Sequence, residues 1–129
     1  MKKLFVIATL TLLTGCSTVQ NWIPSFWDDN QSAKIIDVRQ QVHNIDCTKP
    51  QLPQAQGIAN GLQWFRLYSD SKGMLQKDVL RITAPIEETA VEWVKRSETQ
   101  EGSKVYCEMK KKVLVKQIDR AASGILGRW

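Results

Sequence analysis

Apolar residues recur at helical spacing in several stretches of the chain after residue 28. In residues 28–47 the spacings between apolar positions are three, four and three, which places them on one face of a helix. These positions are Ile35, Val38, Val42 and Ile45. In residues 103–129 the spacings are seven, four, three and four. This second face consists of Cys107, Leu114, Ile118, Ala121 and Ile125. Both stretches are predicted to be amphipathic helices.

The stretch between residues 55 and 72 fits two structures. Ile58, Leu62 and Phe65 suit one helical face, whereas the run "LQWFRLY" also fits a short strand. Gly57 and Gly61 lower helix stability by about 1 kcal/mol each relative to alanine, but they also permit close packing of two backbones. We favour a helix, including for residues 61–68, because no second convincing strand exists to pair with this one.

In residues 75–97 the apolar positions keep the spacing of one helix face on both sides of a proline. The apolar face is Val79, Ile82, Ile86, Ala90 and Trp93. Pro85 either kinks one helix or stands in the first turn of a second helix capped by Thr83. Glu87 and Glu88 favour the second option, because acidic residues suit a helix N-terminus.

Two breaks separate these stretches. "KPQLP", residues 49–53, contains two prolines and is predicted to be a loop, and "TQEGSK", residues 99–104, is the next break. Residues 28–129 are therefore predicted to form one all-α domain, a small helical bundle of about four helices.

The N-terminus has a different pattern. "MKKLFVIATLTLLTGCS" places two lysines before an apolar run that is too short for a membrane-spanning helix, and ends in Leu-Thr-Gly-Cys. This order resembles the signal peptide and lipobox of bacterial lipoproteins. The resemblance implies a signal peptide at residues 1–15, lipidation of Cys16 and a membrane anchor. An ordinary secretory signal with an incidental Cys16 is the alternative, and a transmembrane anchor is less favoured.

In that family the residue after the lipidated cysteine influences sorting, and Ser17 permits export to the outer membrane. The resemblance therefore implies an outer-membrane protein that faces the periplasm, with the inner membrane as the less favoured location. Residues 16–27 form an aromatic-rich tether. Trp22 and Trp27 either bind the membrane–water interface or pack under the first helix.

The remaining cysteines, Cys47 and Cys107, are predicted to form one disulfide in an oxidising compartment. A metal or redox pair is the alternative. No Cys-x-x-Cys motif is present, and His43 is the single histidine, so a zinc site would lack ligands. We expect no metal and no cofactor.

Charge is unevenly distributed. The net charge of +5 falls to +3 if Lys2 and Lys3 leave with the signal peptide, so nucleic acid is a poor partner. Residues 83–101 carry a balance of −3 and residues 102–129 a balance of +5. Lys112, Lys116 and Arg120 share one face of the last predicted helix. They are either an ordinary solvated face or a strip that binds a partner or a membrane.

Candidate chemistry is sparse. His43 lies off the apolar face of its helix and is expected to be a solvated surface residue, although Asp37 and Asp46 are near in sequence. No motif of a nucleophilic hydrolase, a nucleotide-binding loop or a metalloprotease is present in the sequence. Trp129 ends the chain and either folds back, contacts a partner or enters the bilayer surface.

The sequence therefore favours a non-enzymatic, lipid-anchored periplasmic lipoprotein that acts through protein–protein contacts at the cell envelope. Lys112, Lys116, Arg120 and Trp129 are the expected binding residues. The outer-membrane subunit of a phage lysis spanin shares the lipobox and small size, and is one alternative. A small periplasmic hydrolase would need a pocket with convergent carboxylates, and a ligand carrier would need an internal cavity.

Overall fold

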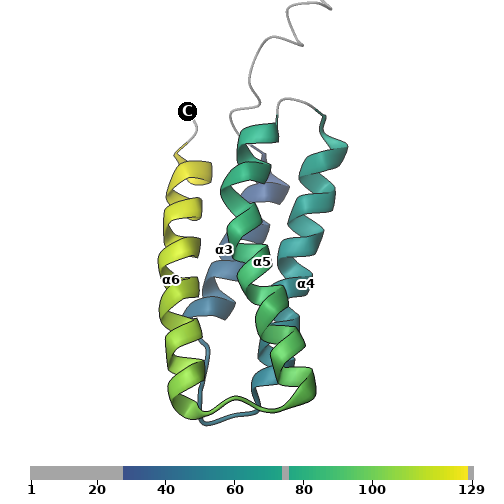
Figure 1. The fold of residues 1–129 in the computed structure, drawn as a ribbon. Coiled ribbons are helices and arrows are strands. Elements are labelled where there is room, and N and C mark those ends of the chain that lie inside the picture. The colour runs from purple at the N-terminus through teal and green to yellow at the C-terminus, as the bar shows by residue number, and fades with distance from the viewer. Residues whose placement is uncertain (1–27, 74–75, 128–129) are drawn as a thin grey trace, which may run out of the picture.

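The computed structural model describes residues 28–73 and 76–127, which form four antiparallel helices and, within those ranges, no strand (Figure 1). The helices are α3 (Asp29–His43), α4 (Gln51–Ser71), α5 (Lys77–Thr99) and α6 (Lys104–Leu126). The all-α bundle predicted from the sequence is confirmed. Residues 61–68 belong to α4, so the strand interpretation of this segment is wrong.

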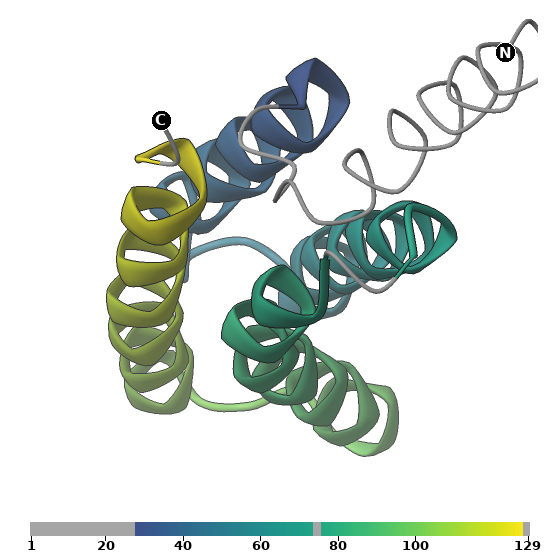
Figure 2. The ribbon, with the colours of Figure 1, turned by 90° about the horizontal axis from the view of Figure 1, so that it is seen from above.

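The four helices are arranged in a ring, in the order α3, α4, α5, α6 (Figure 2). Each helix packs against the two that flank it, and α6 also closes the ring against α3. α4 and α6 therefore lie diagonally across the bundle. Each helix has one face toward the shared core and an opposite face that no other helix in the described part of the chain covers.

The core consists of the apolar faces that the spacing predicts. Ile35, Val38 and Val42 of α3 are buried, as are Ile58, Leu62 and Phe65 of α4. Trp93 is the largest fully buried side chain. Ile82 is the exception, because its side chain is 36% exposed and lies between α5 and α6. Its inclusion in the core was wrong.

α5 is one helix, and the prediction of a new helix capped by Thr83 is wrong. Pro85 lies inside α5, and the Thr83 hydroxyl instead donates to the Val79 carbonyl one turn earlier, at 3.0 Å. A proline removes one backbone hydrogen bond from a helix interior. Pro85 is exposed, so the Arg81 carbonyl that loses its helical partner lies on the solvent side of the helix.

α3 and α4 approach each other closely at Gly61. A β-carbon placed there would lie 2.8 Å from Val38 Cγ2, which is closer than such contacts normally come.

α4 also begins earlier than predicted, at Gln51, so Pro53 lies in its first turn and not in a loop. A proline is tolerated in that turn because its missing N–H has no partner within the helix.

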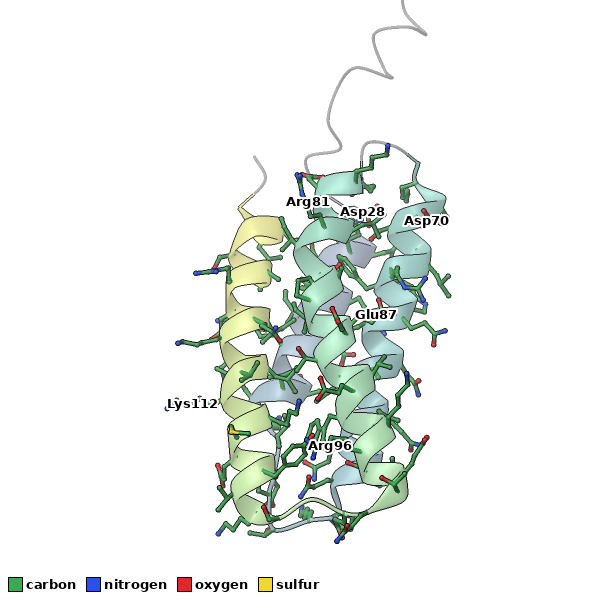
Figure 3. All side chains as sticks on the ribbon, viewed as in Figure 1. Asp28, Asp70, Arg81, Glu87, Arg96 and Lys112 are labelled. Atoms are coloured by element: carbon green, nitrogen blue, oxygen red, sulfur yellow. A yellow bond between two sulfur atoms is a disulfide. The ribbon has the colours of Figure 1, made fainter. Side chains whose placement is uncertain are left out.

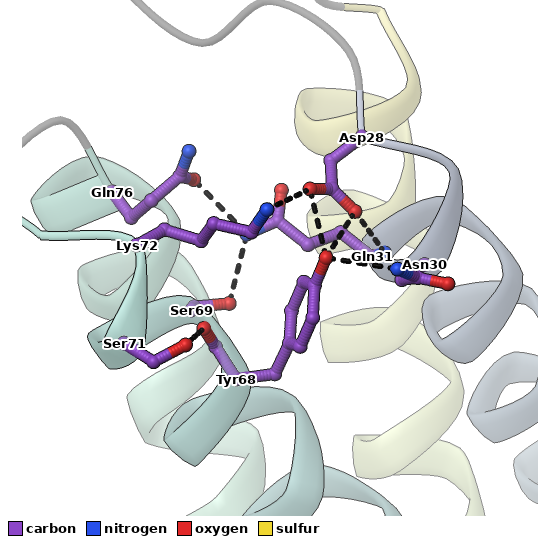
Figure 4. A network of polar contacts seen from close by, with 8 residues as sticks. All are labelled: Asp28, Asn30, Gln31, Tyr68, Ser69, Ser71, Lys72 and Gln76. Carbon is purple, nitrogen blue, oxygen red and sulfur yellow. Dashed lines mark hydrogen bonds and ion pairs between the residues drawn. The ribbon is translucent and has the colours of Figure 1, made fainter.

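Polar residues fasten the end of the bundle at which α3 begins (Figure 4). Asp28 caps α3 by accepting from the Gln31 N–H at 2.9 Å, and it also accepts from the Tyr68 hydroxyl of α4. Lys72 Nζ lies 3.3 Å from the same carboxylate. Partial burial would raise the pKa of Asp28, but the hydrogen bonds from Gln31, Tyr68 and Lys72 outweigh it and lower the pKa overall.

A second polar cluster fastens the opposite end. The Gln51 side chain, which is buried, donates to the Gly102 carbonyl and accepts from the Trp93 indole N–H at 3.0 Å. Cys47, which follows α3, is bonded to Cys107 in the first turn of α6, with their Cα atoms 5.7 Å apart. The predicted disulfide is confirmed, and Cys107 points into the core as its helical face requires.

Candidate partner-binding surface

The side of α6 that points away from the core is half apolar and half basic. Successive residues of a helix are rotated by about 100°, so the residues opposite the buried face follow each other along one line. This line, which we call the α6 outer face, consists of Val105, Met109, Lys112, Val113, Lys116 and Arg120. It begins apolar near the N-terminus of α6 and becomes basic near its C-terminus.

The apolar half of the α6 outer face is strongly exposed. Val105 is 77% exposed, Met109 57% and Val113 42%. Single exposed apolar side chains are ordinary on protein surfaces, but three in succession at one-turn spacing on one helix are not. Residues spaced in this way pack well against another helix or another extended surface.

The basic half contains the three cations that the sequence singled out. The structure places Lys112, Lys116 and Arg120 on one exposed line, and Figure 3 shows Lys112 projecting away from the bundle. Within residues 28–73 and 76–127, no ion pair involves any of the three. The two preceding lysines differ. Lys110 pairs with Glu92 of α5 at 3.3 Å, and Lys111 donates to the Ile45 carbonyl.

A groove between α5 and α6 adjoins the basic half. It has a volume of about 690 Å³ and is open on one side. Ile82, Pro85 and Gly124 contribute to its apolar surface. Three cations, Arg81, Lys116 and Arg120, belong to its lining, and none of the lining residues is a carboxylate.

Two features of the groove follow from single residues. Gly124 has no side chain, and a β-carbon there would come within 3.6 Å of Ile82 Cδ1, so the glycine helps to keep the groove open. The side-chain oxygen of Gln117 is buried in the groove wall and has no hydrogen-bond partner in the described part of the chain. Unpaired buried acceptors are costly, so this amide favours a ligand that donates a hydrogen bond.

The acidic residues of α6 lie to the side of the α6 outer face. Asp119 Oδ1 accepts from Arg39 Nε of α3 at 2.8 Å and lies 2.7 Å from His43 Nε2. The hydrogen bond from His43 lowers the pKa of Asp119, partial burial opposes this, and Arg39 adds to the lowering. Glu108 is three turns before Asp119 on the same side of α6. Among the described residues, neither Glu108 nor Asp119 forms an ion pair with a cation of the α6 outer face.

The contact of His43 with Asp119 was not predicted. His43 lies at the surface as expected. It is not simply solvated, because its ring, on α3, contacts the Asp119 carboxylate on α6. The two residues are 76 positions apart, so their sequence neighbours carry no signal of the contact. Asp37 and Asp46, the acids near His43 in sequence, bond elsewhere, Asp37 to Gln41 and Asp46 to Thr48.

An aromatic pair lies on α4, diagonally across the bundle from α6. Trp64 and Tyr68 of α4 stack with their ring centroids 4.9 Å apart, and Lys34 Nζ lies 5.0 Å from the centroid of the Trp64 ring. These rings already contact each other and a cation. They are therefore a weaker candidate for an interface than the α6 outer face.

Several predicted site residues lie outside the described residues: Cys16, Trp22, Trp27 and Trp129. Among residues that the structure does describe, no group of three or more histidine, cysteine, aspartate or glutamate side chains could hold a metal ion. None of the four helices is both long enough and apolar enough to span a bilayer.

Comparison of the chain with models of known protein families, with characterised proteins and with solved structures finds no match. We therefore infer a function from the geometry above and from the resemblance of residues 1–17 to lipoprotein signal peptides.

Proposed function

We propose that this chain is a non-enzymatic lipoprotein, anchored to the outer membrane through acylated Cys16, that binds a protein partner in the periplasm. The α6 outer face carries this proposal, because three exposed apolar side chains follow one another along it, next to three cations that form no ion pair with any described residue. A solvent-facing helix surface is normally polar and mixed in charge. Exposed valines and a methionine next to unpaired cations are therefore a reason to favour an interface here, among the described residues.

The scaffold supports such a role. The disulfide joins the loop after α3 to the first turn of α6, and Asp119 fastens the other half of α6 to α3. α6 is therefore held at both ends, which reduces the conformational entropy lost when a partner binds. The acyl anchor would add localisation, because it confines the protein to the membrane surface on which its partner is reached.

The groove between α5 and α6 suits partner binding better than it suits the two other classes considered. A hydrolase would need convergent carboxylates, and the groove lining contains none. A carrier of small ligands would need an internal cavity, and this groove is open on one side. An open, apolar and cationic groove beside an exposed helix face favours binding to a macromolecule.

The anchor is tested by the intact mass of protein extracted from membranes, before and after reduction and alkylation. We expect a diacylglyceryl-type mass addition at Cys16 and two thiols that become free only on reduction. An unacylated chain in the soluble fraction would contradict the proposed anchor.

The contact is tested by photo-crosslinking in growing cells, with a photoreactive amino acid placed at Met109. The matched control position is Trp64, which is comparably exposed but lies on α4, diagonally across the bundle. We expect one discrete crosslinked complex from position 109, and no complex of the same mass from position 64. Equal adducts at both positions, or none at position 109, would count against the α6 outer face as an interface.

A further inference from the structure

We infer that the partner presents an acidic amphipathic helix, which packs along the α6 outer face with its carboxylates on Lys116, Arg120 and Arg81. This inference rests on the proposed function and specifies the charge and the fold of the partner's binding segment. The charges that line the groove support it. Arg81 belongs to α5 and lines the groove together with Lys116 and Arg120, so cations from two helices converge where no carboxylate of the lining opposes them. An occupant with negative charge is complementary to this site.

The spacing of side chains along α6 supports a helical partner. Val105, Met109 and Val113 are four residues apart, and Lys116 and Arg120 continue the same line. A row of side chains at one-turn intervals fits between the rows of another helix. From Val105 to Arg120 the row is about 22 Å long, so a partner helix of about 15 residues matches it.

A second copy of this chain fits poorly. If two α6 outer faces packed in parallel, the cations of one would lie opposite the cations of the other. If they packed antiparallel, cations would lie opposite Val105 and Met109. The parallel arrangement places like charges in contact, which destabilises an interface, and the antiparallel arrangement offers the basic half only a single flanking carboxylate, Glu108.

An anionic membrane is also disfavoured. The cations lie in the half of α6 nearest to the end of the bundle at which α3 begins, whereas Val105 lies near the opposite end (Figure 1). A bilayer that touched only the basic end of the bundle would leave Val105 exposed and uncovered. The exposed apolar residues of the α6 outer face are valine and methionine, not the tryptophan and tyrosine that favour the membrane interface.

The test uses the full acylated chain in nanodiscs of zwitterionic lipid and a labelled helical peptide of about 20 residues. The peptide carries three leucines at one-turn spacing and, further along the same face, three glutamates. It is made in both orders, to match parallel and antiparallel packing. Fluorescence anisotropy measures binding. In two control peptides, lysines replace the glutamates or serines replace the leucines.

We expect one order of the acidic peptide to bind, and both control peptides to bind about tenfold more weakly or worse. Two variants should each weaken binding of the acidic peptide about tenfold or more. These are Met109→Glu and the double variant Lys116→Glu/Arg120→Glu. Lys95→Glu is the control for charge reversal, because it replaces one exposed cation by an acid on α5, in a different recess that α5 shares with α4. The lysine peptide should bind Lys116→Glu/Arg120→Glu better than it binds the unaltered chain. All these residues are exposed, and thermal unfolding checks that each variant folds.

Other results would overturn the inference. Equal binding of the glutamate and lysine peptides would remove the charge argument. Protection of Met109 from oxidation in nanodiscs that contain phosphatidylglycerol, without peptide binding, would identify a membrane as the occupant. A dimer that Met109→Glu dissociates would identify a second copy. If the peptide fails while the adduct at position 109 still forms in cells, the partner chemistry is wrong but the proposed function stands.

Discussion

Gly61→Ala is predicted to destabilise the bundle although alanine is the better helix former. The new β-carbon would lie 2.8 Å from Val38 Cγ2, and Val38 is fully buried with a stiff, β-branched side chain. Overpacking of this kind costs about 1–3 kcal/mol, and the gain in helix propensity is about 1 kcal/mol. The net loss in the free energy of unfolding is therefore about 1 kcal/mol.

Gly124→Ala is the matched control. It is also a glycine-to-alanine change in a helix, but its β-carbon would meet only Ile82 Cδ1, at an ordinary 3.6 Å. We expect it to stabilise the domain by about 0.5–1 kcal/mol. Urea unfolding, followed by far-ultraviolet circular dichroism, gives both values. If Gly61→Ala stabilised the protein as much as Gly124→Ala does, α3 and α4 could not approach as closely as the structure shows.

Three further predictions concern the fastenings of the bundle. Replacing Cys47 and Cys107 by alanine opens a loop of 60 residues and should lower the free energy of unfolding by about 4 kcal/mol. Denaturant titrations measure this loss, and a loss below about 1 kcal/mol would contradict the chain-entropy explanation. Because the pKa of Asp28 is lowered in the folded state, its stabilising effect is complete above the unfolded pKa of about 3.9 and is lost as the pH falls through the lower folded value. Asp28→Asn should therefore keep the cap but flatten the acid limb of a plot of stability against pH, and an unchanged acid limb would refute this. Gln51→Leu leaves the Trp93 indole N–H unpaired in the core and should cost about 1–3 kcal/mol in thermal unfolding, while a neutral result would show that the bond to Gln51 is dispensable.

Much of the fold could be predicted from local periodicity. The buried faces of α3 and α6 matched the spacing of their apolar residues, and the position of Cys107 on the core face agreed with the disulfide. Pro85 was interpreted wrongly because a proline inside a helix and a proline in a first turn differ mainly in what packs around them. In α5 the apolar face continues on both sides of Pro85, and that packing keeps one helix intact.

The errors and omissions depend on how the helices pack. Ile82 has the phase of a core residue, but it faces the gap that Gly124 leaves on α6. The contact of Asp119 with Arg39 and His43 joins helices far apart in sequence. The α6 outer face was only half recognised. Its cations were identified, whereas Val105, Met109 and Val113 carried a signal that was missed, an apolar repeat opposite the predicted core face.

The binding role of the α6 outer face is tested most directly at Met109, a native residue that is 57% exposed in the free domain. The oxidation rate of its thioether is measured by mass spectrometry in isolated envelopes and in the purified protein. Oxidation of Trp64, on the diagonally opposite helix, serves as the internal reference. We expect Met109 to be oxidised severalfold more slowly in envelopes while Trp64 is unaffected. Equal rates for Met109 in both samples would show that the α6 outer face is free in the envelope, and would contradict its proposed binding role.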